Sequence, residues 1–417
     1  MLQTAHQLTF RGNLKESRYG WLRLTPAYSV HLVNNLIAGY LQERHARQHI
    51  EILDPFCGTG TTALTCAEQG LPCTTSDINP FLLWLTKAKA QSYMSADIQA
   101  CSEIACSIAA DINQGNSIHD AWLPSLHQIE KWWDAPTLAA LACIKQQIAR
   151  HESALASPVV DLLKIAFCRL LIEEAHVSFG HQSMSFKKTR AEQPRLLDRA
   201  YLLAEAWQTA VLDVMRAAQS EMRQAPQIVL QDARTISDAF ESEHFSHVIT
   251  SPPYPNRMSY IRELRPYMYW LGYLTESRDA GEMDWQAIGG TWGCATSNLA
   301  RWQPTSEMKL PDVNLPEMLD QIACYSPLLA QYVRKYFEDI IQHCRALYPL
   351  IKPGGHLAYI VGNSKFYDVV LPTEMLFATI FRMVGFTNIH VELLRKRSSK
   401  KELVEYAATA RKPGGHA

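Results

Sequence analysis

The chain has 417 residues, 47% of them hydrophobic, and its 40 Lys+Arg against 41 Asp+Glu give a net charge of -1. This length allows a large hydrophobic core in more than one structural unit. Because the charges balance, the protein as a whole does not attract polyanions, so any nucleic-acid site must come from local clusters of basic residues. The ten cysteines form no CxxC pair, and there is no leader peptide and no run of about 18 apolar residues. We therefore expect a reduced cytoplasmic protein without a metal site, disulfides or a membrane span.

A strand, a glycine-rich turn and a helix are predicted in "HIEILDPFCGTGTTALTCAEQG" (residues 49–70). A short apolar run suits a buried parallel strand that ends at Asp54, and the helix begins at Thr61. Between them, Gly58 and Gly60 carry no Cβ, so the backbone can lie against a ligand. The turn is neither GxGxxG nor GxxxxGK[ST], which argues against pyrophosphate or triphosphate. An acid at the strand end suits a cationic ligand such as a sulfonium, and an ordinary strand-to-helix turn is the alternative.

Two further predicted strands also end at an aspartate. "GLPCTTSDINPF" is extended through Thr75, and the strand ends at Asp77. The sequence separation between Asp54 and Asp77 suits one βαβ unit, and an acid at this place can accept hydrogen bonds from ribose hydroxyls. "QIVLQDART" (227–235) predicts a buried third strand that ends in Asp232. Aspartate disfavours strands and is seldom buried unpaired, so three of them at successive strand ends indicate a ligand cleft.

An extra unit separates the second and third predicted strands. About 150 residues lie between Asp77 and Asp232, far more than a normal crossover needs. Their apolar periodicity predicts helices, as in "RAYLLAEAWQTAVLDVMRAAQSEM" (199–222). A fourth strand is predicted in "HFSHVITSPPY" (244–254), and a fifth in "HLAYIVGNS" after a turn at "KPGG" (352–355).

Three motifs give the chain a resemblance to a known family. "DPFCGTGTT" resembles the cofactor motif of the amino-methylating DNA methyltransferases, which use S-adenosyl-L-methionine. "TSPPY" (250–254) resembles their catalytic motif in its cytosine-N4 form, and "LTPAYSVHLVNNLI" (24–37) resembles the helix that closes over the methionine end of the cofactor. The resemblance implies an α/β fold: a Rossmann-like class I methyltransferase sheet with a large helical insertion between its second and third strands.

The resemblance also implies roles for the matching residues. The expected catalytic residues are Ser251, Pro252, Pro253 and Tyr254. The Pro252 carbonyl would accept a hydrogen of the exocyclic amine, Ser251 would face the same amine or ring, and Tyr254 would stack on a base flipped from the duplex. Serine rather than aspartate at position 251 favours cytosine N4 over adenine N6, with exceptions in both directions. The expected cofactor-binding residues are Pro26, Asp54, Pro55, Phe56, Cys57, Gly58, Gly60, Thr61, Asp77, Ile78, Asp232 and Ala233.

Candidate DNA contacts follow the catalytic motif and recur near the C-terminus. "NRMSYIRELRPYMYWLGY" (256–273) carries Arg257 and Arg262 close to the expected flipped base, and a helix with a solvated arginine face is the alternative. A second basic cluster lies in "LRKRSSKKELVEY" (394–406), in the last predicted hairpin, where it can neutralise several phosphates. Its basic residues are Arg395, Lys396, Arg397, Lys400 and Lys401. The basic stretch at 183–195 stays undecided between a DNA contact and a solvated loop.

The chain is expected to divide into the following parts. They are a lid helix and cofactor half (1–95), the helical insertion (96–225), a catalytic half (226–275 and 330–417) and a Trp/Gly-rich loop (276–329). The insertion and the loop are both candidates for DNA recognition, although the loop's tryptophans could instead form a satellite core. The predicted function is transfer of a methyl group to N4 of a flipped-out cytosine in double-stranded DNA. A partner restriction endonuclease is expected from the resemblance alone. Adenine-N6 methylation, RNA amino-methylation and a non-catalytic DNA-binding subunit stay open.

Overall fold

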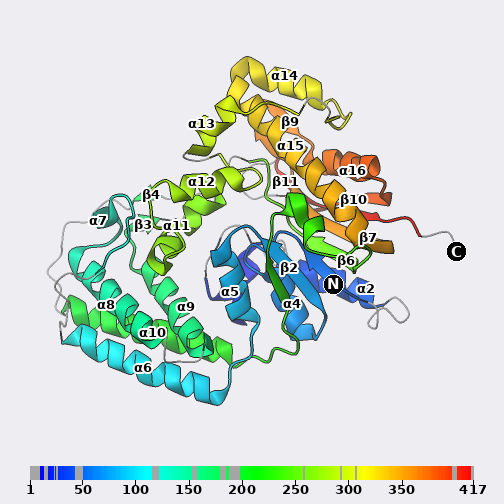
Figure 1. The fold of residues 1–417 in the computed structure, drawn as a ribbon. Helices are drawn as coiled ribbons and strands as arrows, with labels where there is room; N and C mark the ends of the chain where they lie inside the picture. The colour runs from blue at the N-terminus through cyan, green and yellow to red at the C-terminus, as the bar shows by residue number, and fades with distance from the viewer. Residues whose placement is uncertain are drawn as a thin grey trace.

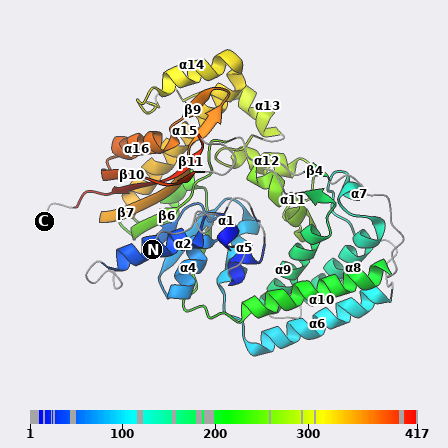
Figure 2. The same ribbon diagram turned by 180° about the vertical axis from the view of Figure 1, so that it is seen from behind.

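The computed structural model places a sheet with its helices beside a second group of helices, α6 and α8–α10 (Figures 1 and 2). It describes residues 10–13, 17–22, 24, 27–42, 50–114, 122–152, 157–178, 185–186, 198–256, 259–291, 294–305, 308–396 and 402–414. Within these residues, no helix is both long and apolar enough to cross a membrane. The short elements outside the main layers are α1 (Phe10–Asn13), η1 (Ser17–Gly20), η2 (Ala233–Asp238), η3 (Tyr348–Leu350), β8 (Ser364–Phe366) and β9 (Val369–Leu371).

The described strands form a seven-stranded sheet in the order β10-β11-β7-β6-β1-β2-β5. They are β1 (Ile52–Asp54), β2 (Cys73–Asp77), β5 (Gln227–Leu230), β6 (Phe245–Thr250), β7 (Ile351–Gly362), β10 (Thr387–Lys396) and β11 (Val404–Arg411). Five neighbouring strands, β5, β2, β1, β6 and β7, run parallel to one another, and β11 is antiparallel to both β7 and β10. The predicted α/β fold class is confirmed. The strand order reverses at β1, because β2 lies on one side of it and β6 on the other.

Helices bury both faces of the sheet. They are α2 (Val30–Leu41), α4 (Thr61–Gln69), α5 (Pro80–Ala90), α15 (Pro327–Leu347) and α16 (Thr373–Val384). Ile52 and Ile249 share a core with α2 and α4, whereas their neighbours Leu53 and Val248 share another with α15 and α16. Successive side chains of a strand point to opposite faces, so these two cores lie on opposite sides of the sheet. Cys73 belongs to the first core.

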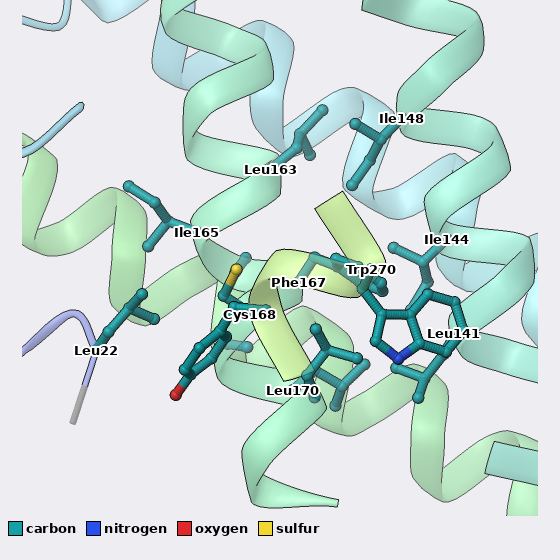
Figure 3. Close-up of a cluster of buried hydrophobic side chains, with 14 of the residues drawn as sticks. Leu22, Leu141, Ile144, Ile148, Leu163, Ile165, Phe167, Cys168, Leu170 and Trp270 are labelled. Atoms are coloured by element: carbon teal, nitrogen blue, oxygen red, sulfur yellow. The ribbon is translucent and has the colours of Figure 1, made fainter. Parts of the chain in front are cut away.

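The insertion between β2 and β5 is helical, and its core is continuous with side chains of α5 and of the segment after β6. Its elements are α6 (Ser95–Asn113), α7 (Ile129–Trp132), α8 (Ala135–Glu152), α9 (Ser157–Glu173), β3 (Val177–Ser178), β4 (Ser185–Phe186) and α10 (Arg199–Ala218). Figure 3 shows Leu163, Phe167 and Leu170 of α9 in this core, together with Trp270 of α11 (Tyr260–Leu271). Because α11 follows the predicted catalytic turn, the core joins the insertion to the catalytic half.

Two local predictions, the burial of the third strand and a turn before the fifth, differ from the structure. Both features depend on how a strand pairs with its neighbours. The third strand, β5, was expected to be buried, but it is the edge of the sheet, where only β2 pairs with it and Leu230 is 62% exposed. The turn expected at 352–355 lies inside β7 instead. There Gly354 has a φ of +77° and the register to β6 shifts, which indicates a bulge.

The stretch expected to be a Trp/Gly-rich loop, 276–329, contains helices in its described residues. They are α12 (Asp279–Gln286), α13 (Cys294–Arg301) and α14 (Leu315–Tyr325). Two of them are only 8 residues long, too short for a helical period to stand out in the sequence. Trp285 is half-buried, with the ammonium of Lys335 4.9 Å from its ring centroid, which matches the satellite-core alternative. Trp292 lies outside the described residues.

Candidate active site

Three loops meet where the parallel strands end. They follow β1, β2 and β6, and β1 pairs with both of the other strands. The hydroxyl of Thr250, the last residue of β6, donates a hydrogen bond to Oδ1 of Asp54, the last residue of β1, at 2.6 Å. This contact lies at the reversal of strand order, where open α/β sheets bind their ligands. The predicted cofactor loop and the predicted catalytic turn are therefore neighbours.

Asp54 is a buried carboxyl group with an unused acceptor. Its side chain has no solvent exposure, and its Oδ1 atom accepts hydrogen bonds from Thr250 and from the amide of Phe56, the latter at 3.2 Å. Its Oδ2 atom has no hydrogen-bond partner among the described residues. Burial raises the pKa of Asp54 to about 7, because the charged form loses its hydration. A cation or a hydrogen-bond donor placed here would offset that cost.

Asp77 shapes the glycine-rich loop from the end of β2. Its Oδ2 accepts a hydrogen bond from the amide of Gly58 at 3.0 Å, and its Oδ1 accepts one from the amide of Asn79 at 2.9 Å. Burial raises the pKa of Asp77 to about 6 despite these donors. Ile78 is half-buried beside it. Asp77 therefore fixes the loop and holds a second carboxyl group next to it.

The loop from Pro55 to Gly60 lies closely on α5. Gly60 has a φ of +76°, and a Cβ atom there would lie 2.8 Å from Cγ2 of Thr86. The buried thiol of Cys57 is 3.0 Å from Oγ1 of the same threonine, and Nζ of Lys89 donates to the Thr59 carbonyl at 3.0 Å. Thr61 then begins α4. Pro26, the remaining predicted contact of this group, lies outside the described residues.

Asp232 is placed differently from the other two aspartates. It follows the edge strand β5 and caps η2 by accepting a hydrogen bond from the amide of Arg234 at 2.8 Å. It also pairs with the guanidinium of Arg234, whose Nη2 lies 2.6 Å from Oδ2. Burial alone would raise the pKa of Asp232, but the hydrogen bonds from Arg234 lower it below the usual value. Its carboxylate is thus already neutralised, and Ala233 is buried next to it.

The predicted catalytic turn, 251–254, is held from three sides. Oγ of Ser251 donates a hydrogen bond to the carbonyl of Ile360 in β7 at 3.1 Å. The carbonyl of Pro253 accepts a hydrogen bond from the hydroxyl of Tyr336 at 2.7 Å. The amide of Tyr254 donates to the hydroxyl of Tyr260 at 3.4 Å. The neighbouring strand β7 and helices α15 and α11 therefore fix the turn.

Sequence reasoning missed the polar residues of α15. Besides Tyr336, these are Asp339, which pairs with Arg234, and His343, whose Nδ1 donates to the carbonyl of Ala233 at 2.8 Å. Burial lowers the pKa of His343 to about 4, so its imidazole is neutral and its Nε2 can accept from Tyr359. These residues recur at helical spacing on the buried face of an amphipathic helix. Polar residues on an otherwise apolar face were the signal that could have revealed them.

The predicted DNA contacts divide into described and undescribed residues. Arg257, Arg397, Lys400 and Lys401 lie outside the described residues. Arg262 is on α11, half-buried, and its Nε atom has no hydrogen-bond partner among the residues that the structure describes. Arg395 differs from prediction: it makes a bidentate ion pair with Glu405 across the β10–β11 hairpin, with both N···O distances 2.7 Å. Lys396 is exposed.

The β10–β11 hairpin ends at the same edge of the sheet as the predicted catalytic turn. β11 is antiparallel to both β7 and β10, so β10 runs in the same direction as β7. Its last residue, Lys396, pairs with Val404, and the adjacent Glu405 pairs with Gly362 at the end of β7. Lys396 therefore lies at the edge of the sheet that carries the catalytic turn.

The arrangement fits S-adenosyl-L-methionine. Its sulfonium and ammonium groups are cations, and the site offers the carboxyl groups of the buried Asp54 and the half-buried Asp77, whose pKa values are raised by burial. The glycine-rich loop between them lies against α5 without room for a Cβ at Gly60. Among the described residues no group of three or more His, Cys, Asp or Glu is placed to hold a metal ion.

Comparison with known proteins finds similarity to DNA methyltransferases. The family model of the D12 class N6 adenine-specific DNA methyltransferases matches residues 35–113. The Type II methyltransferase M.MvaI of Kocuria varians is 21% identical over 368 residues, which cover 84% of this chain and 78% of that protein. The Type II methyltransferase M.BsoBI of Geobacillus stearothermophilus is 20% identical over 463 residues, which cover 97% and 86%.

Among solved structures, the rRNA methyltransferase aviRa of Streptomyces viridochromogenes aligns over 97% of this chain and 96% of its own. At 12% identity and a TM-score of 0.29, that alignment supports no statement about the substrate. The acids at the strand ends, the SPPY turn, the matched family and the two Type II relatives carry more weight. Together they support an S-adenosyl-L-methionine-dependent DNA methyltransferase that modifies exocyclic amino groups.

Proposed function

We propose that the protein methylates the exocyclic N4 amine of a cytosine in double-stranded DNA. The observation that carries this proposal is the position of the SPPY turn. Thr250, directly before the turn, donates its hydroxyl to Asp54 at 2.6 Å, so the turn lies next to the residues that we assign to the cofactor. A proline turn that presents fixed carbonyls beside a methyl donor is suited to activating an amine.

In this proposal the turn makes the amine nitrogen more nucleophilic. That nitrogen is a poor nucleophile because its lone pair is delocalised into the ring. A fixed carbonyl that accepts one of its hydrogens favours the pyramidal, reactive form with little reorganisation. Tyr336 already occupies the carbonyl of Pro253, so we assign this role to the carbonyl of Pro252. Tyr254 is assigned to stack on the base, which must leave the duplex because N4 is otherwise paired.

Asp54, Asp77 and the loop between Phe56 and Gly60 are the residues that we assign to the cofactor. When bound, S-adenosyl-L-methionine supplies an electrophilic methyl group, so the enzyme needs no covalent bond to the base. The two carboxyl groups would ionise and bind its positive charges or hydroxyl groups. Asp232 is paired with Arg234, so we assign it and Ala233 to the shape of the pocket wall, and its charge is not needed for the cofactor.

Adenine N6 is the second candidate, because the matched family is described as N6 adenine-specific. The match spans residues 35–113, the cofactor half, and does not include Ser251. The hydroxyl of Ser251 donates to the carbonyl of Ile360, a hydrogen bond that an ionised aspartate could not donate. This contact favours serine at position 251, the residue that the family resemblance links to cytosine, and so supports the proposal.

We also propose that the helical insertion takes part in target recognition. Its core is continuous with α11, which follows the catalytic turn. Because two relatives are named Type II methyltransferases, a restriction–modification role with a partner endonuclease is part of the proposal. Plasmid DNA recovered from cells that express the protein should then resist a restriction endonuclease that cuts plasmid from control cells.

The base identity has a direct test. Purified protein is incubated with S-adenosyl-L-methionine carrying a deuterated methyl group and with mixed-sequence duplex DNA, which is then digested to nucleosides for mass spectrometry. Labelled N4-methylcytosine is the expected product. Labelled N6-methyladenine would keep the site but overturn the cytosine assignment. No labelled nucleoside from DNA, with a labelled product from RNA, would overturn the DNA substrate.

The control for this test is the Asp77→Ala variant, purified in the same way. Asp77 holds the amide of Gly58 and supplies one of the two carboxyl groups, so its loss should abolish the labelled product. Product that persists at the wild-type level in this variant would come from a contaminating enzyme or would contradict the assigned cofactor site. Binding of S-adenosyl-L-methionine to the variant, measured by calorimetry, separates these two explanations.

A further inference from the structure

Arg18 is a fully buried arginine outside the predicted motifs. It lies on η1, has no solvent exposure, and its guanidinium lies 5.0 Å from the ring centroid of Tyr93 and 5.5 Å from that of Trp21. The guanidinium makes five hydrogen bonds to described residues, and each ends on a backbone carbonyl. The acceptors are Lys89 at 2.8 Å, Gln91, Ala217 at 3.4 Å, Ala218 at 2.6 Å and Ser220 at 2.7 Å.

These carbonyls belong to the two ends of the helical insertion. α5 ends at Ala90, after which the chain runs into α6, and α10 ends at Ala218, after which the chain returns to β5. The C-terminus of a helix carries a partial negative charge, so two helix ends share one buried cation here. The planar fork of arginine can serve both ends at once, which a single lysine ammonium cannot.

Lys89 links the same place to the cofactor loop. Its carbonyl accepts the hydrogen bond from Arg18, and its side chain, only 2% exposed, donates from Nζ to the carbonyl of Thr59 at 3.0 Å. Thr59 lies between the two loop glycines, and the amide of Gly58 is held by Asp77. One residue therefore connects the loop to Arg18, and Arg18 connects it to both ends of the insertion.

Both cations are costly to bury. Burial lowers the pKa of Arg18 to about 10 and that of Lys89 to about 8, because each loses its hydration. Apolar side chains of similar size would fill this space without that cost. They could not, however, hold carbonyls of the cofactor loop and of the two connecting segments in one arrangement.

We propose that Arg18 and Lys89 are positioning residues that couple cofactor binding at residues 56–60 to both ends of the helical insertion. This inference rests on the proposed function, because it takes the 56–60 loop as the cofactor site. The coupling is reciprocal by linkage: an insertion that moves when it contacts DNA alters the affinity of the loop for the cofactor, and the cofactor alters the insertion. The coupling can therefore be detected by adding S-adenosyl-L-methionine without DNA.

The test is hydrogen exchange followed by mass spectrometry, with and without saturating S-adenosyl-L-methionine. In the wild type, the cofactor should slow exchange in residues 56–60 and also in 91–94 and 219–226, the two connecting segments, by about threefold or more. In Arg18→Lys, protection of 56–60 should persist while protection of the two segments is lost. Lys89→Met should lose the same distant protection and bind the cofactor more weakly.

The matched control is Arg169→Lys, because Arg169 is an insertion arginine that pairs with Glu173 and Asp213. That variant should keep the distant protection. Protection of 56–60 in the wild type without protection of the connecting segments, or distant protection retained in Arg18→Lys, would overturn the inference. If Arg18→Lys does not fold, retained distant protection in Lys89→Met overturns it instead. Absence of protection at 56–60 in the wild type would be a failure of the proposed cofactor site itself.

Discussion

The hydroxyl of Tyr336 donates a hydrogen bond to the carbonyl of Pro253 at 2.7 Å, from the buried face of α15. One turn further along the same helix, Asp339 pairs with Arg234 at 3.2 Å, and His343 then holds the carbonyl of Ala233 at 2.8 Å. A single helix thus supports the catalytic turn and the loop after β5. Tyr336 thus occupies one acceptor position of the Pro253 carbonyl, which is why we assign the substrate to the carbonyl of Pro252.

Tyr336→Phe is expected to lower kcat for methyl transfer by about tenfold. The substitution leaves the Pro253 carbonyl unpaired, which costs about 1–2 kcal/mol in positioning the turn. The affinity for S-adenosyl-L-methionine should not change, because the cofactor residues are untouched. Steady-state methyl transfer and calorimetry measure the two quantities. Tyr332→Phe is the control, since the Tyr332 hydroxyl donates to Gly289 at 3.3 Å. Equal losses in both variants would contradict a specific role for Tyr336.

The carboxyl groups of Asp54 and Asp77 predict a pH-dependent affinity for the cofactor. Their pKa values, raised by burial to about 7 and about 6, mean that each is partly protonated near neutral pH. A cation binds the ionised form, so the affinity for S-adenosyl-L-methionine should rise between pH 5 and pH 8. Asp54, with a pKa of about 7, is the last of the two to ionise. Calorimetry over this range measures it. S-adenosylhomocysteine, whose sulfur is neutral, should show a shallower rise, and identical profiles for the two ligands would contradict the charge argument.

The same pKa of Asp54 predicts how stability changes with pH. A carboxyl group whose pKa is raised in the folded state binds more protons when folded than when unfolded, so its contribution to stability is lost as the pH rises toward about 7. Without cofactor, Asp54→Asn should match the wild type near pH 4 and exceed it at pH 8 by up to about 4 kcal/mol. Denaturant unfolding at both pH values tests this. A wild type that gains stability relative to the variant between them would refute it.

Local patterns were enough to predict the parts of the site that are local. Asp54 and Asp77 are the last residues of two short strands, the SPPY turn directly follows a third, and the parallel order of the sheet brings strand ends to one edge. The glycine turn was visible because a positive φ such as that of Gly60 favours glycine. These features depend on a few consecutive residues, so the sequence specifies them directly.

Features that depend on a distant partner could not be predicted. The apolar run of β5 looks the same for a central strand and for an edge strand, and only the pairing order decides its burial. Asp232 was expected to bind the cofactor, and nothing in the sequence indicated that its charge is paired with Arg234, which in turn is held by Asp339 from α15. Arg18 carries no motif, because its partners are carbonyl groups, which every residue has.

The β10–β11 hairpin predicts different results for two adjacent basic residues. Lys396 is exposed at the active-site edge, so Lys396→Ala should lower the slope of log affinity for mixed-sequence DNA against log salt concentration by about 0.9. Arg395→Met should leave this slope unchanged and lower the melting temperature, because it breaks the pair with Glu405. Fluorescence anisotropy at several salt concentrations gives the slopes. A reduced slope in Arg395→Met would show that this arginine leaves Glu405 to contact phosphate.

Gly60 and Gly39 predict opposite effects of the same substitution. Gly60→Ala places a Cβ 2.8 Å from Cγ2 of Thr86 at a φ of +76°, so the loop must move off α5, and S-adenosyl-L-methionine affinity should fall more than about tenfold. Gly39 lies inside α2, and a Cβ added there would meet no atom within 4 Å, so Gly39→Ala should stabilise the protein by about 1 kcal/mol and leave binding unchanged. Calorimetry and thermal unfolding measure both. Adding Thr86→Ala to Gly60→Ala removes the obstructing hydroxyl and methyl groups of Thr86 and should restore part of the affinity. Wild-type affinity in Gly60→Ala alone would mean that the cofactor does not depend on this loop.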